Sequence, residues 1–100
     1  MKYNKLVRDK IPEYIARKGG KAITHIANDK EYWEKLKEKL QEETQEFFEN
    51  ETIEELADIQ EVIKAISDYL KFDETQIALV RKKKLEERGA FTKKIILDES

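Results

Sequence analysis

The chain has 100 residues, which suits a single domain over residues 1–100 and leaves no room for a second one. Charged residues make up 42% of the sequence and hydrophobic residues 39%, a balance that favours helices with one buried stripe and a charged outer face. The formal net charge of -2 argues against a protein that coats a nucleic-acid backbone. Because the chain has no cysteine and a single histidine, thiolate chemistry and multi-histidine metal cages are excluded, and any metal would need oxygen ligands.

The hydrophobic residues occur in runs of only a few residues, so we expect no membrane-spanning segment. The opening residues MKYNKLVRDK lack the apolar stretch of a signal peptide. We therefore expect a cytoplasmic protein whose partners include neither a membrane nor a nucleic acid.

The first predicted element is a short helix that begins near Ile11 and ends at Gly19 and Gly20, because Pro12 suits the first turn of a helix and glycine suits its end. Residues 22–27 are partly β-branched and are flanked by turn-forming residues. This pattern predicts an extended connector or a small strand.

Two long helices are predicted next. The first covers residues 30–50, where apolar residues recur at helical spacing and Asn28 or Asp29 can cap the N-terminus. The second covers residues 52–71 and begins with Thr52, which has a glutamate three residues later as in a capping box. The link between them is very short, so we expect the two helices to pack antiparallel.

A third long helix is predicted between the N-cap Asp73 and the C-terminal stop Gly89, followed by an extended tail over residues 91–97. The sequence thus predicts an all-α protein, an antiparallel helical bundle with a short N-terminal helix and an extended C-terminal tail. Apolar residues lie on more than one face of the 52–71 helix, which favours self-association.

Acidic residues interrupt both apolar stripes. At about 100° per residue, the main apolar residues of the 30–50 helix lie within an arc of roughly 60°: Trp33, Leu36, Leu40 and Phe47. Glu43 lies just beside that arc, and Glu46 lies on the adjoining edge of the same face. On the 52–71 helix, Glu55 falls inside the apolar range and Asp58 borders it.

Four converging carboxylates in a thin apolar core would repel one another and lose solvation, so a cation is expected among them. A hard divalent ion that prefers oxygen ligands, such as Mg²⁺, fits this set. The alternative is that these acids form a solvated face, paired with lysines such as Lys35, Lys37 and Lys39.

The acids also form a recognisable pattern. ETQE at residues 43–46 followed by ELAD at residues 55–58 resembles the ExxE…ExxD signature of the all-α NTP pyrophosphatases, which include MazG, dimeric dUTPases and phosphoribosyl-ATP pyrophosphohydrolases. Residues 3–12 are similar to the opening of a compact MazG-related branch, and RGAF at residues 88–91 is similar to its closing RGxF segment. Only eight residues separate the two acidic motifs, fewer than in many family members, and this departure leaves the substrate class open.

The resemblance implies a bundle of the MazG type that associates as a homodimer or a higher homo-oligomer. It also implies hydrolysis between the α- and β-phosphates of a nucleotide, giving a monophosphate and pyrophosphate. Mg²⁺ would be held by Glu43, Glu46, Glu55 and Asp58, and Glu43 or Glu46 would act as general base, with Glu42 as a further candidate.

A triphosphate needs cationic groups as well. We expect Lys5, Arg8, Lys10 and Arg88 to bind phosphate, the arginines as planar forks. Further candidates are Lys83, Lys84, Lys93 and Lys94. The alternative is that all of these are ordinary surface charges or structural ion pairs.

Aromatic residues offer a second kind of contact. Tyr32, Trp33 or Phe91 can stack on a base, although large aromatics at helical spacing are more often core or interface residues. Two other functions stay open from the sequence: a phosphoribosyl-ATP pyrophosphohydrolase that uses the same carboxylates, and a helical interaction module without catalysis.

Overall fold

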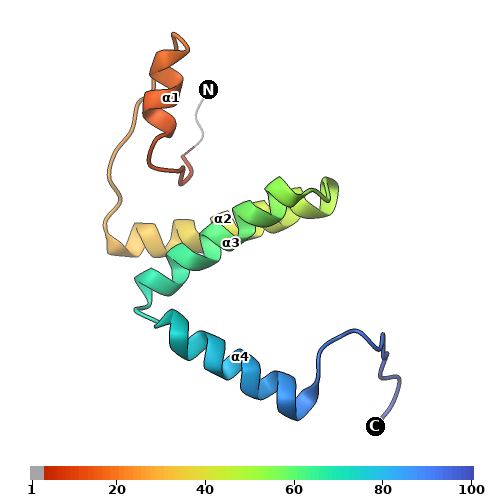
Figure 1. Cartoon of the computed structure of the whole chain (residues 1–100). Coiled ribbons are helices and arrows are strands. Elements are labelled where there is room, and N and C mark those ends of the chain that lie inside the picture. The colour runs from red at the N-terminus through yellow and green to blue at the C-terminus, as the bar shows by residue number, and fades with distance from the viewer. Residues whose placement is uncertain (1–3) are drawn as a thin grey trace.

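The computed structural model describes residues 4–100, which form four helices and no strand. Helix α1 covers Ile11–Arg17, α2 covers Asp29–Glu49, α3 covers Ile53–Tyr69 and α4 covers Glu74–Arg88 (Figure 1). The predicted all-α class is confirmed for this part of the chain. The small strand considered for residues 22–27 does not form, because this extended connector has no second strand beside it.

The helix boundaries follow from caps that the sequence predicts. The side chain of Asn28 accepts a hydrogen bond from a backbone N–H in the first turn of α2, at 2.9 Å. Thr52 does the same for α3 at 3.2 Å, and Asp73 for α4 at 2.8 Å. Gly89, with φ 80°, ends α4 in a backbone conformation that costs glycine little. All four predicted boundary residues are confirmed.

Helices α2 and α3 form the expected antiparallel hairpin, joined by residues 50–52 (Figure 1). Its far end is closed by aromatic rings. Tyr69 stacks on Trp33 with ring centroids 5.2 Å apart, and meets the ring of Tyr32 edge-on at 5.6 Å. Trp33 and Tyr32 therefore pack between the two helices, as large aromatics in small domains usually do.

The core between α2 and α3 is narrow. Leu36 and Val62 are its buried hydrophobic side chains, and Leu36 is only 1% exposed. Two polar residues are buried beside them, Glu43 and Ser67. The Ser67 hydroxyl donates to the carbonyl of Ile63 within its own helix, at 2.9 Å, so its burial is satisfied locally, whereas that of Glu43 needs another explanation.

Helices α1 and α4 do not complete a bundle with the hairpin. Within residues 4–100, α2 and α3 are the one pair of helices in extensive contact, and α4 leaves the hairpin at the end opposite the α2–α3 link (Figure 1). The radius of gyration is 17.8 Å, compared with about 13 Å for a compact 100-residue domain. Only the α2–α3 hairpin of the predicted bundle is thus present. An apolar stripe predicts that one face of a helix is covered, but it does not show which other surface covers that face.

The turn after α3 sets the direction of α4. Lys71 adopts a left-handed φ of 59°, and the backbone N–H of Phe72 donates to the carbonyl of Ser67 at 2.9 Å. These features resemble a Schellman ending and stop α3 abruptly. The apolar residues of α4, including Leu79, Val80 and Leu85, remain exposed as a result.

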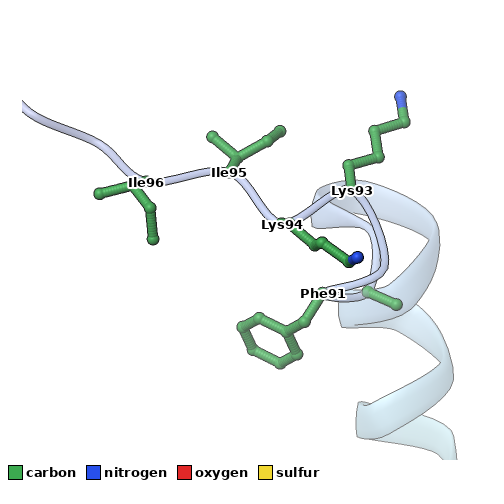
Figure 2. A pocket seen from close by; sticks show the side chains of 6 residues that line it. Phe91, Lys93, Lys94, Ile95 and Ile96 are labelled. Carbon is green, nitrogen blue, oxygen red and sulfur yellow. The ribbon is translucent and has the colours of Figure 1, made fainter.

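The C-terminal segment has no helix or strand, but only part of it is the extended tail predicted for residues 91–97. It begins with a turn in which the N–H of Lys94 donates to the carbonyl of Phe91 at 3.3 Å, and then runs extended. Figure 2 shows the side chains of Phe91, Ile95 and Ile96 spread around this segment near the end of α4. Phe91 is 97% exposed, so no other part of residues 4–100 covers this apolar side chain.

None of the helices in residues 4–100 combines the length and the apolar character that crossing a membrane requires.

Candidate metal centre

Three of the four predicted carboxylates meet at the linked end of the hairpin. Glu43 comes from the last turns of α2, and Glu55 and Asp58 come from the first turns of α3. Each offers one carboxylate oxygen, and these oxygens all lie within 4.8 Å of one another. The antiparallel hairpin therefore brings together acids from both motifs, as the sequence predicts.

Glu43 and Glu55 carry buried oxygens that no hydrogen bond satisfies. Glu43 is only 7% exposed; its Oε1 lies 3.2 Å from the Lys39 ammonium, while its Oε2 is buried without a partner. Glu55 Oε2 is also buried and unpartnered. Leaving a carboxylate oxygen buried in this way is costly, so two such oxygens on carboxylates of the same group favour a bound cation. A set made of carboxylates alone suits a hard ion such as Mg²⁺.

The start of α3 leaves the side chain of Glu55 available to this group. In a complete capping box, the glutamate would accept a hydrogen bond from the backbone N–H of Thr52. That N–H instead donates to the carbonyl of Asn50 at 2.8 Å. Thr52 still caps the backbone of Glu55, so the first turn is held in place while the carboxylate is directed at its neighbours.

Two cations from the segment before α1 reach the same end of the hairpin. The Lys5 ammonium lies 3.0 Å from Glu42 on α2, and the Arg8 guanidinium lies 2.7 Å from Asp58 on α3. Both ion pairs are partly exposed, so each contributes little to stability by itself. Their effect is to place two cationic groups beside the carboxylates at the linked end of the hairpin.

Glu46, the fourth predicted carboxylate, lies outside the group of three, but the negative charges of its neighbours affect its pKa. Burial, followed by the close approach and negative charge of Glu43 and by the charges of Glu42 and Glu55, raises the pKa of Glu46 above its ordinary value. Part of the rise in the pKa of Glu46 therefore comes from repulsion between its carboxylate and the neighbouring negative charges.

Glu42 is affected in the opposite direction. Burial acts to raise its pKa, but hydrogen bonds from Lys5 and Lys39 and the charges of both outweigh it and lower the pKa below its usual range. Lys39 responds in turn: burial lowers its pKa, and the hydrogen bonds to Glu43 and Glu42 raise it by more. Lys39 thus stays firmly charged between two glutamates.

The remaining predicted phosphate ligands lie elsewhere in the chain. Lys10 precedes α1 and is exposed, and Arg88 is the last residue of α4, which extends away from the hairpin (Figure 1). Neither is brought to the carboxylates within one chain. The sequence analysis considers Lys39 only as a lysine that pairs with acids on a solvated face, and does not identify its contact with Glu43. The spacing of four residues between Lys39 and Glu43 is the feature of the sequence that could have indicated this contact.

Comparisons of the chain with family models, with curated proteins and with solved structures found no match.

Proposed function

We propose that the protein is a Mg²⁺-dependent nucleotide pyrophosphohydrolase that cleaves the bond between the α- and β-phosphates. The observation that carries this proposal is the pair of buried, unpartnered oxygens of Glu43 and Glu55, which lie beside Asp58 on two facing helices. A structural ion-pair network would satisfy such oxygens from within the protein, whereas a cation site leaves them available.

In this proposal Glu43, Glu55 and Asp58 hold the ion, which would neutralise the phosphates and polarise them for attack when bound. Glu46 lies next to Glu43 without belonging to the group of three, so its carboxylate stays free to accept a proton from the attacking water. We therefore favour Glu46 over Glu43 as general base. Arg8, already beside Asp58, is positioned to contact a phosphate oxygen.

The similarity of the two acidic motifs and both terminal segments to the MazG-like all-α NTP pyrophosphatases supports this reaction and assigns the chain to that family as part of the same proposal. Phosphoribosyl-ATP is the second candidate substrate, because its cleavage would use the same carboxylates. A non-catalytic helical module is the third reading, and it predicts no response of the protein to Mg²⁺.

The surface area supports self-association as part of the proposed function. The chain exposes 9572 Å², whereas a compact protein of 11.9 kDa exposes about 6,000 Å². Obligate dimers bury roughly 1,000–2,500 Å² per subunit, so the excess is large enough for such an interface. We propose a homodimer or a higher homo-oligomer in which second copies cover the apolar residues of α4 and of residues 91–97.

The reaction is tested by incubating the protein with Mg²⁺ and a panel of NTPs, dNTPs and phosphoribosyl-ATP, and by measuring pyrophosphate and monophosphate release. Glu43→Gln and Asp58→Asn should each lower kcat by at least about a hundredfold, because the ion loses a charged ligand. Glu61→Gln, an exposed position in the middle of α3, is the matched control and should retain activity. Absence of pyrophosphate with every substrate, or full activity in both site variants, would refute the proposal.

A further inference from the structure

Lys39 lies one helical turn before Glu43 and is the most enclosed cation at the hairpin end among the described ion pairs. Its side chain is 16% exposed. Its ammonium lies 3.2 Å from Glu43 Oε1 and 3.2 Å from Glu42 Oε2. The Lys39 ammonium thus contacts one oxygen of Glu43, and the other oxygen of the same carboxylate is the buried, unpartnered one.

A second lysine provides a comparison within the same hairpin. Lys64 on α3 pairs with Asp68 at 3.1 Å, with the same spacing of four residues. That pair is open to solvent, since the Lys64 side chain is 53% exposed. In both pairs the lysine precedes the acid, which is the less favourable order for helix stability. Stabilisation of α2 is therefore a weak reason for the Lys39 side chain to be enclosed, because enclosure costs its ammonium part of its solvation.

We propose that Lys39 is a positioning residue for the cation site: its contact with Oε1 fixes the Glu43 carboxylate in the orientation that groups it with Glu55 and Asp58 and leaves Oε2 buried without a partner. This inference rests on the proposed function, because it requires that the three carboxylates bind a metal ion. Metal-binding carboxylates are commonly held by such outer hydrogen bonds, and loss of the outer partner weakens binding.

The same ammonium also holds Glu42, together with Lys5. Glu42 is adjacent to Glu43 in sequence, yet it is not one of the three carboxylates that meet. Lys39 therefore separates two neighbouring glutamates, directing one towards the hairpin interior and keeping the other at its edge.

Positioning and simple charge balance predict opposite results when Lys39 is removed. If Lys39 only neutralised negative charge, its loss would make the site more negative and Mg²⁺ would bind more tightly. If Lys39 positions Glu43, its loss frees the carboxylate to rotate and Mg²⁺ binds more weakly. The sign of the change in affinity thus decides between the two roles.

The experiment titrates the full chain with Mg²⁺ alone, following the melting temperature and, by calorimetry, the bound ion. We expect Lys39→Met to raise the half-saturating Mg²⁺ concentration by about 10–100-fold. Lys64→Met, the matched control, should leave it unchanged, and Lys39→Arg should restore most of the affinity because the cation is retained. An unchanged or lower half-saturating concentration in Lys39→Met would overturn the positioning role.

The controls separate this inference from the proposed function. If wild-type protein shows no response to Mg²⁺, the cation site itself is refuted and Lys39 has nothing to position. If the wild type binds and Lys39→Met binds at least as well, only the positioning role fails. Should Lys39→Met not fold, as judged by its circular dichroism, Lys39→Gln takes its place, with the same criterion.

Discussion

Burial and the negative charges of its neighbours together raise the pKa of Glu46, at the linked end of the hairpin, above the ordinary value of a glutamate. A carboxyl whose pKa is raised by folding favours the folded state below its ordinary pKa, and that contribution is lost as the pH rises through the folded value. Ionised Glu46 therefore destabilises the chain at neutral pH when no divalent ion is added.

Replacing Glu46 by glutamine removes that repulsion. In EDTA at about pH 7 we expect Glu46→Gln to raise the melting temperature by about 1–4 °C. The gain should shrink as the pH falls below the ordinary pKa of a glutamate, because folded and unfolded chains then both tend to carry a protonated Glu46. Thermal melts across this pH range measure it, with Glu61→Gln as the control. A melting temperature that does not rise at neutral pH would contradict the repulsion inferred here.

Leu36 is the residue on which the narrow core depends most, because its side chain is only 1% exposed between α2 and α3. We expect Leu36→Ala to lower the free energy of unfolding by about 2–5 kcal/mol. Urea denaturation followed by circular dichroism measures the loss. Leu40→Ala, at a half-buried position on the same helix, is the control, and an equal loss there would show that Leu36 has no special place in the core.

For single residues, the sequence predicted burial where helical periodicity determines which face of the helix a side chain lies on. The burial of Glu43 follows from its angular position beside the apolar arc of its helix, and the structure confirms it. The pairing of Arg8 with Asp58 could not be foreseen, because these residues are 50 positions apart and no pattern relates them. The spacing of four residues allows a contact between Lys39 and Glu43 to be predicted, but it does not show which oxygen of Glu43 stays unpaired.

Among the secondary-structure elements, α3 has a start that serves both folding and the site. The Thr52 hydroxyl accepts a hydrogen bond from the backbone N–H of Glu55, and so fixes the first turn of α3, which carries Glu55 and leads into the turn that carries Asp58. Damage to this cap should therefore weaken both the helix and the cation site.

Removing that hydroxyl tests the link. We expect Thr52→Ala to lower the free energy of unfolding by about 1 kcal/mol, and to raise the half-saturating Mg²⁺ concentration because Glu55 is less well held. Thr52→Ser keeps the hydroxyl and should behave like the wild type in both measurements. If Thr52→Ala and Thr52→Ser change the free energy of unfolding and the half-saturating Mg²⁺ concentration equally, the Thr52 hydroxyl supports neither the helix nor the cation site.

Helix boundaries were largely predictable, since caps such as Asn28, Thr52 and Asp73 and the stop at Gly89 act through local hydrogen bonds and backbone angles. The packing of the helices was predictable only for α2 and α3, whose short link permits little else. The placement of α1 and α4 depends on what covers their apolar faces, and a single sequence does not state whether that surface is its own or that of another copy.

On the scale of the whole molecule, the elongated chain leaves many large apolar side chains in contact with water. They occur on α4, on the outer face of α3 and in the C-terminal segment. A single chain of this composition gains too little from its narrow core, which is why association with further copies forms part of the proposed function.

The expected assembly is measurable by light scattering during size-exclusion chromatography. We expect a mass of at least about twice 11.9 kDa. Leu79→Glu, which places a charge on the exposed apolar face of α4, should shift the protein towards the monomer, whereas Leu79→Met should not. A wild-type protein that elutes as a monomer at all concentrations would exclude the proposed self-association.

The link at residues 50–52 has a final consequence, because it confines all three carboxylates of the candidate metal centre to residues 43–58. The spacing of the three carboxylates is set by one tight turn and by the helices on either side of it. Docking of another copy can therefore reorient α1 and α4 while the coordinating oxygens keep their mutual spacing. The mutual spacing of the three carboxylates is in that sense independent of quaternary structure, whereas the ion pairs of Lys5 and Arg8 depend on where the segment before α1 lies.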